Sequence, residues 1–359
     1  MPAKTGRDYP GAPKTPPPWY NEPMVGQRRK HSLPAGVLPE GAHDRAEDVG
    51  SRVRARAPLP TEEGSRADSA PVETPAERAQ SLVDQLVTLG PEEVAPLVRL
   101  LLPLGNFALE ELVKSFPGPL WRPSLATDSR LPRPQEISAC AAALATFGGE
   151  AVPYLARLMR HTSPTVRYYA AVICGAYANT GLIEPLMQVS LDEDRECRRV
   201  ALHLLSAYQH EPVYRSALAE IRRCASDVAL ALPVRRRAIS ALTQLRDESS
   251  ASLFVDLLAD PDRGVATACR IGLRVLTAHD FGFSRDRWLR WLSARGQEVR
   301  IQWLIEGLGD SRANIRLLAS RELWHLTRFV QPLSETAARD EFLATQRNYQ
   351  RWWTKNHLE

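Results

Sequence analysis

A short phrase returns six times along this chain, and it constrains the fold more than any other feature. Each copy has an apolar residue, then arginine or a small residue, and then alanine or cysteine three positions further on. The copies begin at Ile137, Val166, Cys197, Val234, Val265 and Ile315. Successive starts lie 29 to 50 residues apart, and self-similarity at such a period is typical of stacked supersecondary units. Stacks of this type mostly present surface, so the phrase argues against catalysis.

Residues 1–75 differ in composition from the rest of the chain. They carry 13 of the 28 prolines and few apolar side chains, so they cannot offset the entropy of ordering and are expected to form a disordered tail. Trp19 and Tyr20 stand out there, because two aromatic rings among prolines are costly to leave in water. We interpret them as a candidate docking motif; the alternative is a stray aromatic pair in a linker.

From residue 76 onward the pattern becomes helical. Leu82 and Leu86 belong to one apolar stripe of an expected helix, and no segment shows the alternation that predicts a strand. In the clearest unit, residues 150–178, an amphipathic helix is followed by a turn and a second helix. We therefore predict an all-α repeat array over residues 76–327 and a C-terminal capping helix within residues 328–359.

The arginine of the phrase needs a partner. A cation in the first turn of a helix lies at the positive end of the helix dipole, which costs about 0.3–1 kcal/mol. The turns before these helices contain aspartates, so we predict Arg–Asp hydrogen bonds within or between adjacent repeats. The arginines are Arg167, Arg198, Arg235 and Arg316, and the aspartates are Asp192, Asp194, Asp260, Asp262 and Asp310. The alternative is a row of arginines on a face that binds an acidic partner.

The order of a leucine-rich helix, an Asp-Pro-Asp turn and Val-Arg-x-x-Ala resembles the HEAT repeats of the bacterial phycobilisome-lyase-like (PBS lyase HEAT-like) class. The turn at Asp260 and the phrase at Val166 are the best matches. Ser138, Ala266 and Cys269 depart from the pattern, which makes their units degenerate. The resemblance implies an α-solenoid, a right-handed superhelix of HEAT-like helical hairpins. It also implies a scaffold, because most members of the class resemble scaffolds rather than lyases.

A second repeat is nested near the C-terminal end. Two Leu-Thr pairs are each followed, after a loop, by aromatic residues three positions apart. The first set is Thr277, Trp288 and Trp291, and the second is Thr327, Tyr349, Trp352 and Trp353. Aromatic residues at this spacing share one helical face and can cover the adjacent repeat. We predict hydrophobic caps at these positions; the alternative is an aromatic cage for a ligand.

No arrangement of reactive side chains indicates an active site. None of the eight histidines forms a metal-binding motif such as HExxH, and no glycine-rich phosphate loop is present. His279 and Asp280 could act as an acid–base pair, but without a nucleophile at recognisable spacing a turn-stabilising role is the better interpretation. The five cysteines form no CxxC pair, and they fit small buried positions better than metal sites or disulfides. We therefore expect no catalytic residues, no cofactor and no metal.

Charge and hydropathy narrow the choice of partners. The 46 basic and 42 acidic residues leave a net charge of +4, which argues against a general nucleic-acid binder. No apolar run approaches the length of a membrane span, and the N-terminus lacks the apolar segment of a secretory signal, so we expect a cytoplasmic protein without membrane insertion. The leading hypothesis is a non-enzymatic scaffold that binds another protein. The alternatives are a PBS-lyase-like modifying enzyme and, behind it, a HEAT-like nucleic-acid-binding protein.

Overall fold

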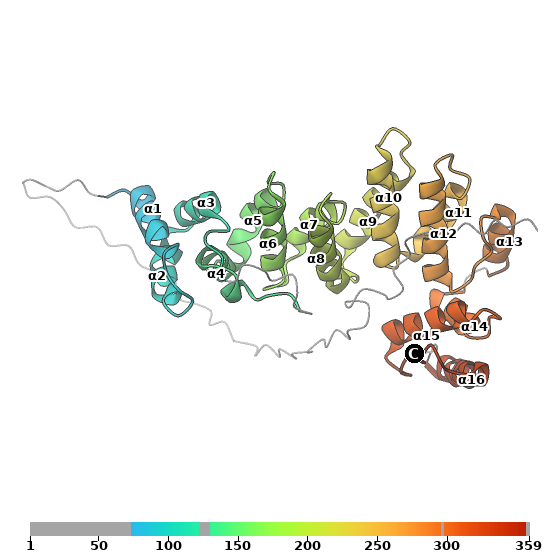
Figure 1. Cartoon of the computed structure of the whole chain (residues 1–359). Coiled ribbons are helices and arrows are strands. Elements are labelled where there is room, and N and C mark those ends of the chain that lie inside the picture. Colours follow the sequence, from blue (N-terminus) through green and yellow to red (C-terminus); the bar gives the residue numbers. More distant parts are fainter. Residues whose placement is uncertain (1–72, 122–129, 296–297, 357–359) are drawn as a thin grey trace, which may run out of the picture. The chain divides into compact units, whose positions relative to one another are not determined.

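The computed structural model describes residues 73–121, 130–295 and 298–356, and every regular element within these ranges is a helix (Figure 1). The α-helices are α1 (Pro75–Leu86), α2 (Val94–Leu101), α3 (Asn106–Ser115), α4 (Ala139–Thr146), α5 (Val152–Leu158), α6 (Pro164–Cys174), α7 (Ile183–Val189), α8 (Arg195–Leu205), α9 (Pro212–Ser226), α10 (Leu232–Gln244), α11 (Ala251–Leu257), α12 (Arg263–Thr277), α13 (Arg285–Arg295), α14 (Arg300–Gly307), α15 (Ala313–Thr327) and α16 (Arg339–Asn356). This architecture is the all-α solenoid that the sequence predicts. The candidate docking motif at Trp19 and Tyr20 lies outside the described residues.

Consecutive helices pack in pairs that correspond to the repeats. The pairs are α5 with α6, α7 with α8, α9 with α10, α11 with α12, and α14 with α15. Second helices of neighbouring repeats also touch, as α6 does with α8 and α10 does with α12. Among helices α5 to α16, two stand outside this scheme: α13 packs on α11, and α16 packs on α14 and α15. The chain therefore stacks repeats and adds one inserted helix and one terminal helix.

The repeated phrase occupies the same register in five second helices. In α6, α8, α10, α12 and α15 its apolar residue is the third helical residue, and the following arginine or alanine is the fourth. The first copy differs, because α4 begins at Ala139 and Ser138 is its N-cap. The Ser138 hydroxyl oxygen accepts a hydrogen bond from the Ala141 N–H at 3.1 Å. The copy at Ile137 therefore starts before its helix, and only five copies are structurally equivalent.

The small residue of the phrase lies where neighbouring helices approach one another. In the five equivalent copies it is Ala170, Ala201, Ala238, Cys269 and Ala319, and all five are fully buried. A side chain of this size lets two helix backbones come close, and close packing of apolar groups is what stabilises a stack of this type.

Gly272 extends this close packing within α12. A Cβ built on Gly272 lies 2.5 Å from a ring carbon of Phe254 and 2.7 Å from the hydroxyl oxygen of Thr243, and both of these side chains are buried. Alanine is favoured over glycine in a helix by about 1 kcal/mol, but overpacking a core costs about 1–3 kcal/mol. Gly272→Ala is therefore expected to lower the free energy of unfolding measured by urea titration.

Gly264, in the first turn of the same helix, provides a matched control. A Cβ there lies 2.5 Å from the guanidinium carbon of Arg236, which is the far end of a flexible, exposed side chain. Arg236 can move aside, so Gly264→Ala is expected to leave stability unchanged or to raise it by up to about 1 kcal/mol. Equal losses of stability in the two variants would contradict the packing argument.

The nested repeat is visible in local geometry. Helices α12 and α15 are both 15 residues long and both end in threonine. The Thr277 hydroxyl donates to the carbonyl four residues earlier at 2.7 Å, and the Thr327 hydroxyl does the same at 2.8 Å. A left-handed residue follows in each case, Ala278 with φ 52° and Arg328 with φ 54°. Both helices therefore stop in the same way, and the chain then leaves the stack to form an extra helix.

No single helix in the described ranges is both long and apolar enough to cross a membrane. One pair, Ala139–Thr146 with Gly148–Leu158, meets the length and composition only when its two parts are added across a 116° bend. The segment Val94–Leu104 is apolar but shorter.

Candidate binding face on α10 and α12

The arginine of the repeated phrase is tied to the backbone of the turn before its helix. The Arg167 Nη1 group donates to the carbonyl oxygens of His161 and Thr162, both at 2.8 Å. Arg198 and Arg316 bind the equivalent two carbonyls of their own turns at 2.6 to 2.9 Å. These acceptors compensate for the unfavourable position of a cation at the start of a helix. The geometry therefore favours a structural role for these arginines over a free binding row.

Four arginines also reach a carboxylate of the next repeat: Arg236 pairs with Asp262, and the other three share one spacing. Arg167, Arg222 and Arg235 each pair with an aspartate 25 residues further along the chain. The partners are Asp192, Asp247 and Asp260, each at 2.6 Å. Sequence reasoning missed Arg222, because this residue lies on the first helix of its repeat and outside the phrase. The pairs join consecutive repeats, and the side chains of Arg235 and Asp260 are each only 4% exposed.

Asp192 shows the electrostatic effect of such a pair. Burial alone would raise the pKa of its carboxyl, but hydrogen bonds from the Arg167 guanidinium and the Asp194 N–H hold that pKa below its ordinary value. The same contact raises the pKa of Arg167. Both groups therefore stay ionised over a wide pH range, which suits a structural tie and not a proton-transfer site.

The other predicted ladder aspartates make local contacts, and Asp262 also pairs with Arg236 of the preceding repeat at 2.7 Å. Asp194 and Asp262 are the N-caps of α8 and α12, and their carboxylates accept backbone N–H groups of those helices. The Asp310 carboxylate pairs with Arg312 at 2.8 Å, while Arg316 reaches only the Asp310 carbonyl. Arg198 and Arg316 thus meet an aspartate through its backbone and not through its carboxylate.

A buried ion triad joins segments that are far apart in sequence. Glu322 on α15 is fully buried and accepts hydrogen bonds from Arg300 at 2.6 Å and from Arg246 at 3.1 Å. Burial opposes ionisation, yet the two guanidinium groups hold the pKa of Glu322 below its ordinary value. Nothing in the repeated phrase points to these residues. They meet only because α14 and α15 pack near the end of α10.

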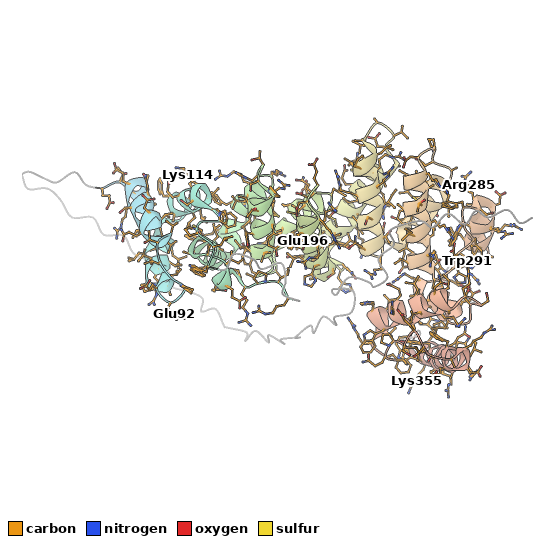
Figure 2. All side chains as sticks on the ribbon, in the orientation of Figure 1. Glu92, Lys114, Glu196, Arg285, Trp291 and Lys355 are labelled. Atoms are coloured by element: carbon orange, nitrogen blue, oxygen red, sulfur yellow. The ribbon has the colours of Figure 1, made fainter. Side chains whose placement is uncertain are left out.

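The aromatic residues of the α13 insertion form a cluster of rings that contact one another. Trp288 is fully buried, and its ring centroid lies 4.8 Å from that of Phe281. The Trp291 ring lies 4.6 Å from the His279 ring and 5.5 Å from Trp303 on α14 (Trp291 is labelled in Figure 2). The insertion therefore covers part of the next repeat, which is the placement that a hydrophobic cap requires.

The aromatic residues of α16 cover the last repeat. Tyr349 is buried, and its hydroxyl oxygen lies 3.3 Å from Thr327 Oγ1. Trp352 stacks on Phe329 with 5.6 Å between ring centroids, and Trp353 packs against the same apolar cluster. Here too the rings touch the chain's own core, as a cap would.

His279 and Asp280 have separate partners. The Nδ1 atom of His279 lies 2.7 Å from the Thr277 carbonyl oxygen, whereas the Asp280 carboxylate accepts two hydrogen bonds from Arg270 at 3.0 and 2.8 Å. Burial would raise the pKa of Asp280, but the bonds from Arg270 hold it below its ordinary value. These contacts suit the turn-stabilising interpretation better than an acid–base pair.

Beside the ladder, helices α10 and α12 carry further arginines, some exposed and some partly buried. Together with one arginine from the turn before α15 they form a surface that we call the basic face. Its members are Arg236, Arg237, Arg263, Arg270, Arg274 and Arg312. Helices α10 and α12 lie side by side (Figure 1), with Arg236 against Gly264 and Thr243 against Gly272. These contacts show that the two helices pack along their length.

Three aspartates neutralise part of this charge. The pairs are Arg236–Asp262 at 2.7 Å, Arg270–Asp280 at 2.8 Å and Arg312–Asp310 at 2.8 Å. Arg237 and Arg274 differ, because the Nε atom of each is buried and has no hydrogen-bond partner within the described part of the chain. Arg274 nevertheless forms an ion pair with Asp280, with 3.7 Å between its Nε atom and the carboxylate. Among the described residues, Arg237 and Arg263 are therefore the members of this set without an ion pair.

Two large apolar side chains interrupt the basic face. Ile271 is 51% exposed and Phe283 is 46% exposed, and the Arg270 guanidinium carbon lies 5.2 Å from the Phe283 ring centroid. Arginine beside exposed aromatic and aliphatic groups is the composition of protein-binding surfaces. Sequence reasoning overlooked this surface, although the arginine run at 235–237 and the helical spacing of Arg270 and Arg274 carried the signal.

The cysteines can be ranked by reactivity. Burial raises the pKa of the thiols of Cys140, Cys174, Cys197 and Cys269 to about 12. Cys224 is only partly buried. Because the thiolate is the reactive form, we expect one thiol per native chain to react quickly with Ellman's reagent, and all five to react in guanidinium chloride. Cys224→Ser should abolish the native reaction; fast labelling of that variant would contradict the assigned burial.

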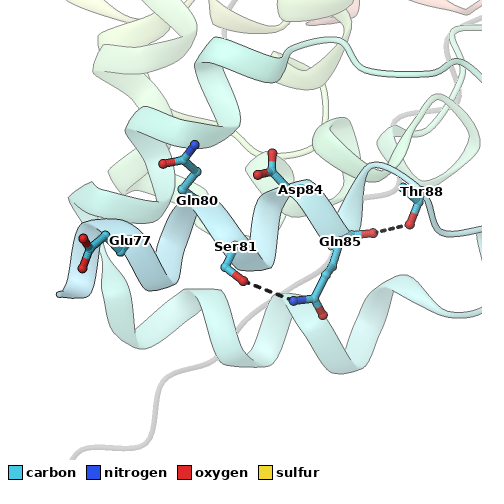
Figure 3. A pocket seen from close by; sticks show the side chains of 6 residues that line it. All are labelled: Glu77, Gln80, Ser81, Asp84, Gln85 and Thr88. Atoms are coloured by element: carbon cyan, nitrogen blue, oxygen red, sulfur yellow. Dashed lines mark hydrogen bonds between the residues drawn. The ribbon is translucent and has the colours of Figure 1, made fainter. Parts of the chain in front are cut away.

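Two hollows in the described surface are shallow and polar. One lies along α1, where Glu77 and Asp84 are among the lining residues (Figure 3). The other lies between α3 and α5 and contains the ion pair of Arg157 and Glu110 at 2.7 Å. Within residues 73–121, 130–295 and 298–356, no group of three or more His, Cys, Asp or Glu side chains is placed to hold a metal ion. The basic face is therefore the strongest candidate for a functional site.

Comparisons with known proteins assign the chain to no family. No protein-family model matches the chain, and no curated protein matches it. Among solved structures it is similar to an engineered protein, with 15% identity over 70% of this chain and 97% of the other and a TM-score of 0.27. It is also similar to a designed armadillo repeat protein, with 15% identity over 69% of this chain and 100% of the other and a TM-score of 0.26. By its own stacked helices, the chain is a helical-repeat protein.

Proposed function

We propose that this chain is a non-enzymatic scaffold of the HEAT-like kind, which binds another protein through the basic face of α10 and α12. One observation carries the proposal: the exposed apolar side chains of Ile271 and Phe283 lie beside arginines of α12, a helix that packs on α10. Groups on packed helices lose little freedom on binding, which lowers the entropic cost of association. Helical repeats present extended surfaces of this type to peptides and domains.

Two further features support the two parts of this proposal. The HEAT-like assignment rests on the register of the phrase, which puts arginine at the fourth helical residue and a buried small residue three positions later. The non-enzymatic assignment rests on the reactive groups themselves. Four thiols have raised pKa values through burial, and His279 and Asp280 are held by separate structural partners.

The proposal can be tested by site-specific photo-crosslinking of the full chain in the cells that produce it. The photoreactive amino acid p-benzoylphenylalanine would replace Ile271 on the basic face or, as a matched control, Ser216, which is exposed on α9. We expect a discrete crosslinked protein at position 271 and none at position 216. The crosslinked species would then be identified by mass spectrometry.

Two results would count against the proposal. Identical crosslinks at both positions would mean that contact is not confined to the basic face. Absence of any protein crosslink at position 271, with normal accumulation of the chain, would remove the scaffold assignment for this surface.

A further inference from the structure

We propose that the outer face of α16 is a second interaction surface, which binds an acidic helical segment of a partner protein. One carboxylate per turn of that segment would face Arg347, Arg351 and Lys355, and an apolar side chain would lie against Phe329. This surface belongs to other helices than the basic face, so the inference goes beyond the proposed function and does not depend on it.

Three basic residues form one row on α16. Arg347, Arg351 and Lys355 follow one another at intervals of four residues, so they share one side of the helix and span roughly 12 Å. All three are exposed (Lys355 is labelled in Figure 2). Arg347 and Arg351 lie two residues before and after buried Tyr349, about 160° around the helix from it. The row therefore points away from α14 and α15, on which α16 packs.

The charge of this row is not neutralised by the described residues. None of the three side chains forms an ion pair there, and Arg351 donates a hydrogen bond only to the neutral side chain of Asn348, at 2.7 Å. The acidic residues of α16 lie in its first turn, at least six residues before Arg347. The row is therefore a local excess of positive charge on an exposed helix face.

The helix dipole accounts for only one member of the row. A cation is favoured near the C-terminal end of a helix, but the effect falls off within the last turn. Lys355 is the basic residue of that turn, whereas Arg347 and Arg351 lie further back. A carboxylate binds a guanidinium group through two parallel hydrogen bonds. Carboxylates of a partner would supply the counter-charge that the described chain does not.

An aromatic pair adjoins the row. Trp352 lies three residues before Lys355, so their side chains are neighbours on the helix surface. Phe329 stacks on Trp352, with 5.6 Å between ring centroids and 28° between ring planes, and it is 45% exposed. Helical spacing and this ring contact therefore join Phe329, Trp352 and the row into one surface. Arginine and aromatic side chains are enriched at protein interfaces.

The size and setting of the row favour a protein helix over nucleic acid or a membrane. Proteins that bind a phosphate backbone typically neutralise about 6–10 phosphates, which three cations do not match. An interfacial helix buries its apolar face in lipid, but Phe342 and Tyr349 on the apolar face of α16 already pack in the core of the last repeat. Acidic residues four positions apart in a helix recur about every 6 Å, which is the spacing of the row.

The test is a fluorescence-anisotropy titration of the full chain with a fluorescein-labelled peptide of sequence AEAALEAALEAALEAALA. A second peptide has glutamine in place of every glutamate, labelled single-stranded DNA is titrated in the same way, and phosphatidylserine vesicles are tested by co-sedimentation. We expect saturable binding of the acidic peptide that weakens as salt rises. The glutamine peptide should bind at least about tenfold more weakly, and DNA and vesicles should also bind more weakly.

Paired charge variants locate the site. Arg347→Gln/Arg351→Gln leaves the helix end intact and is expected to weaken binding of the acidic peptide by about tenfold or more. Arg78→Gln/Arg215→Gln removes the same charge from exposed positions on α1 and α9 and is expected to change it by less than about twofold. Circular dichroism of both variants verifies that the helices persist.

Phe329→Ala tests the apolar half of the surface. The variant removes an exposed ring and no charge, so it is expected to weaken the acidic peptide by about threefold or more while the salt dependence stays that of the unsubstituted chain. Unchanged affinity in Phe329→Ala would remove the aromatic pair from the proposed site.

Three results would overturn the inference: no binding of the acidic peptide, equal weakening in the two charge variants, or tighter binding of DNA or vesicles that Arg347→Gln/Arg351→Gln abolishes. If that variant loses its helices, a photoreactive copy of the acidic peptide is crosslinked to the unsubstituted chain, and crosslinks away from α16 and Phe329 contradict the proposal. The crosslink at position 271 reports on the basic face alone, so either proposal can fail while the other stands.

Discussion

Replacing Arg235 with alanine is expected to lower the free energy of unfolding by about 3–5 kcal/mol, because it leaves a buried carboxylate without its counter-charge. Arg235 and Asp260 are each 4% exposed and lie 2.6 Å apart, and the Arg235 Nε also donates to the Ala225 carbonyl at 3.2 Å. The variant removes both contacts at the junction of two repeats. Urea titration followed by circular dichroism measures the effect.

A surface pair provides the control for this prediction. Arg157 and Glu110 lie 2.7 Å apart with side chains 53% and 45% exposed, so Arg157→Ala should cost no more than about 1 kcal/mol. The double variant Arg235→Met/Asp260→Asn should lose less stability than the summed losses of its two single variants, because no unpaired charge remains at this buried pair. Similar losses for Arg157→Ala and Arg235→Ala would show that burial does not set the strength of these pairs.

Glu322→Gln is expected to destabilise the chain by a similar amount, about 3–5 kcal/mol. The change leaves the guanidinium group of Arg300, which is 2% exposed, without a negative partner, and it weakens the contact to Arg246. Glutamine keeps the size of the side chain, so the loss reports charge and not a cavity. The same unfolding assay measures it, and a loss below about 1 kcal/mol would contradict the picture of a buried triad.

The triad also predicts a pH dependence. The pKa of Glu322 is lower in the folded chain than its ordinary value of 4.5, so its contribution to stability is present above about pH 4.5 and is lost as the pH falls through the folded pKa. Asp192 and Asp280 have lowered pKa values too and act with the same sign. Wild-type stability should therefore fall on acidification, and Glu322→Gln should fall less steeply. Parallel curves for the two proteins would contradict this assignment.

The helices and most of the repeat register could be predicted from the sequence, because both depend on local signals. Apolar spacing, turn residues and the small residue of the phrase fix where the second helices begin, and Val166 and Ala170 are buried as expected. The predicted register is wrong at Ile137, because Ser138 is the N-cap of α4 and not a residue within the helix. A serine after an apolar residue fits both positions, and only the start of α4 decides between them.

The candidate site could be predicted only in part. The arginines on α10 and α12 are visible in the sequence, but which of them has an internal partner depends on turns from other repeats, such as the one that contains Asp280. The buried ion triad could not be predicted from the sequence, because Arg246 and Glu322 are 76 residues apart. A pattern of charged residues along a helix predicts a charged surface. Tertiary packing decides which neighbouring side chains neutralise those charges.

During synthesis, the three arginines that pair with an aspartate 25 residues further along leave the ribosome before their carboxylates. Arg167, Arg222 and Arg235 all precede their partners by 25 residues, and at about 5–20 residues per second this means a delay of about 1–5 s. In that interval the guanidinium group must stay hydrated, because burying it without a counter-charge would cost several kcal/mol. Helices α6, α9 and α10 therefore keep these three guanidinium groups in water until the next repeat has been made.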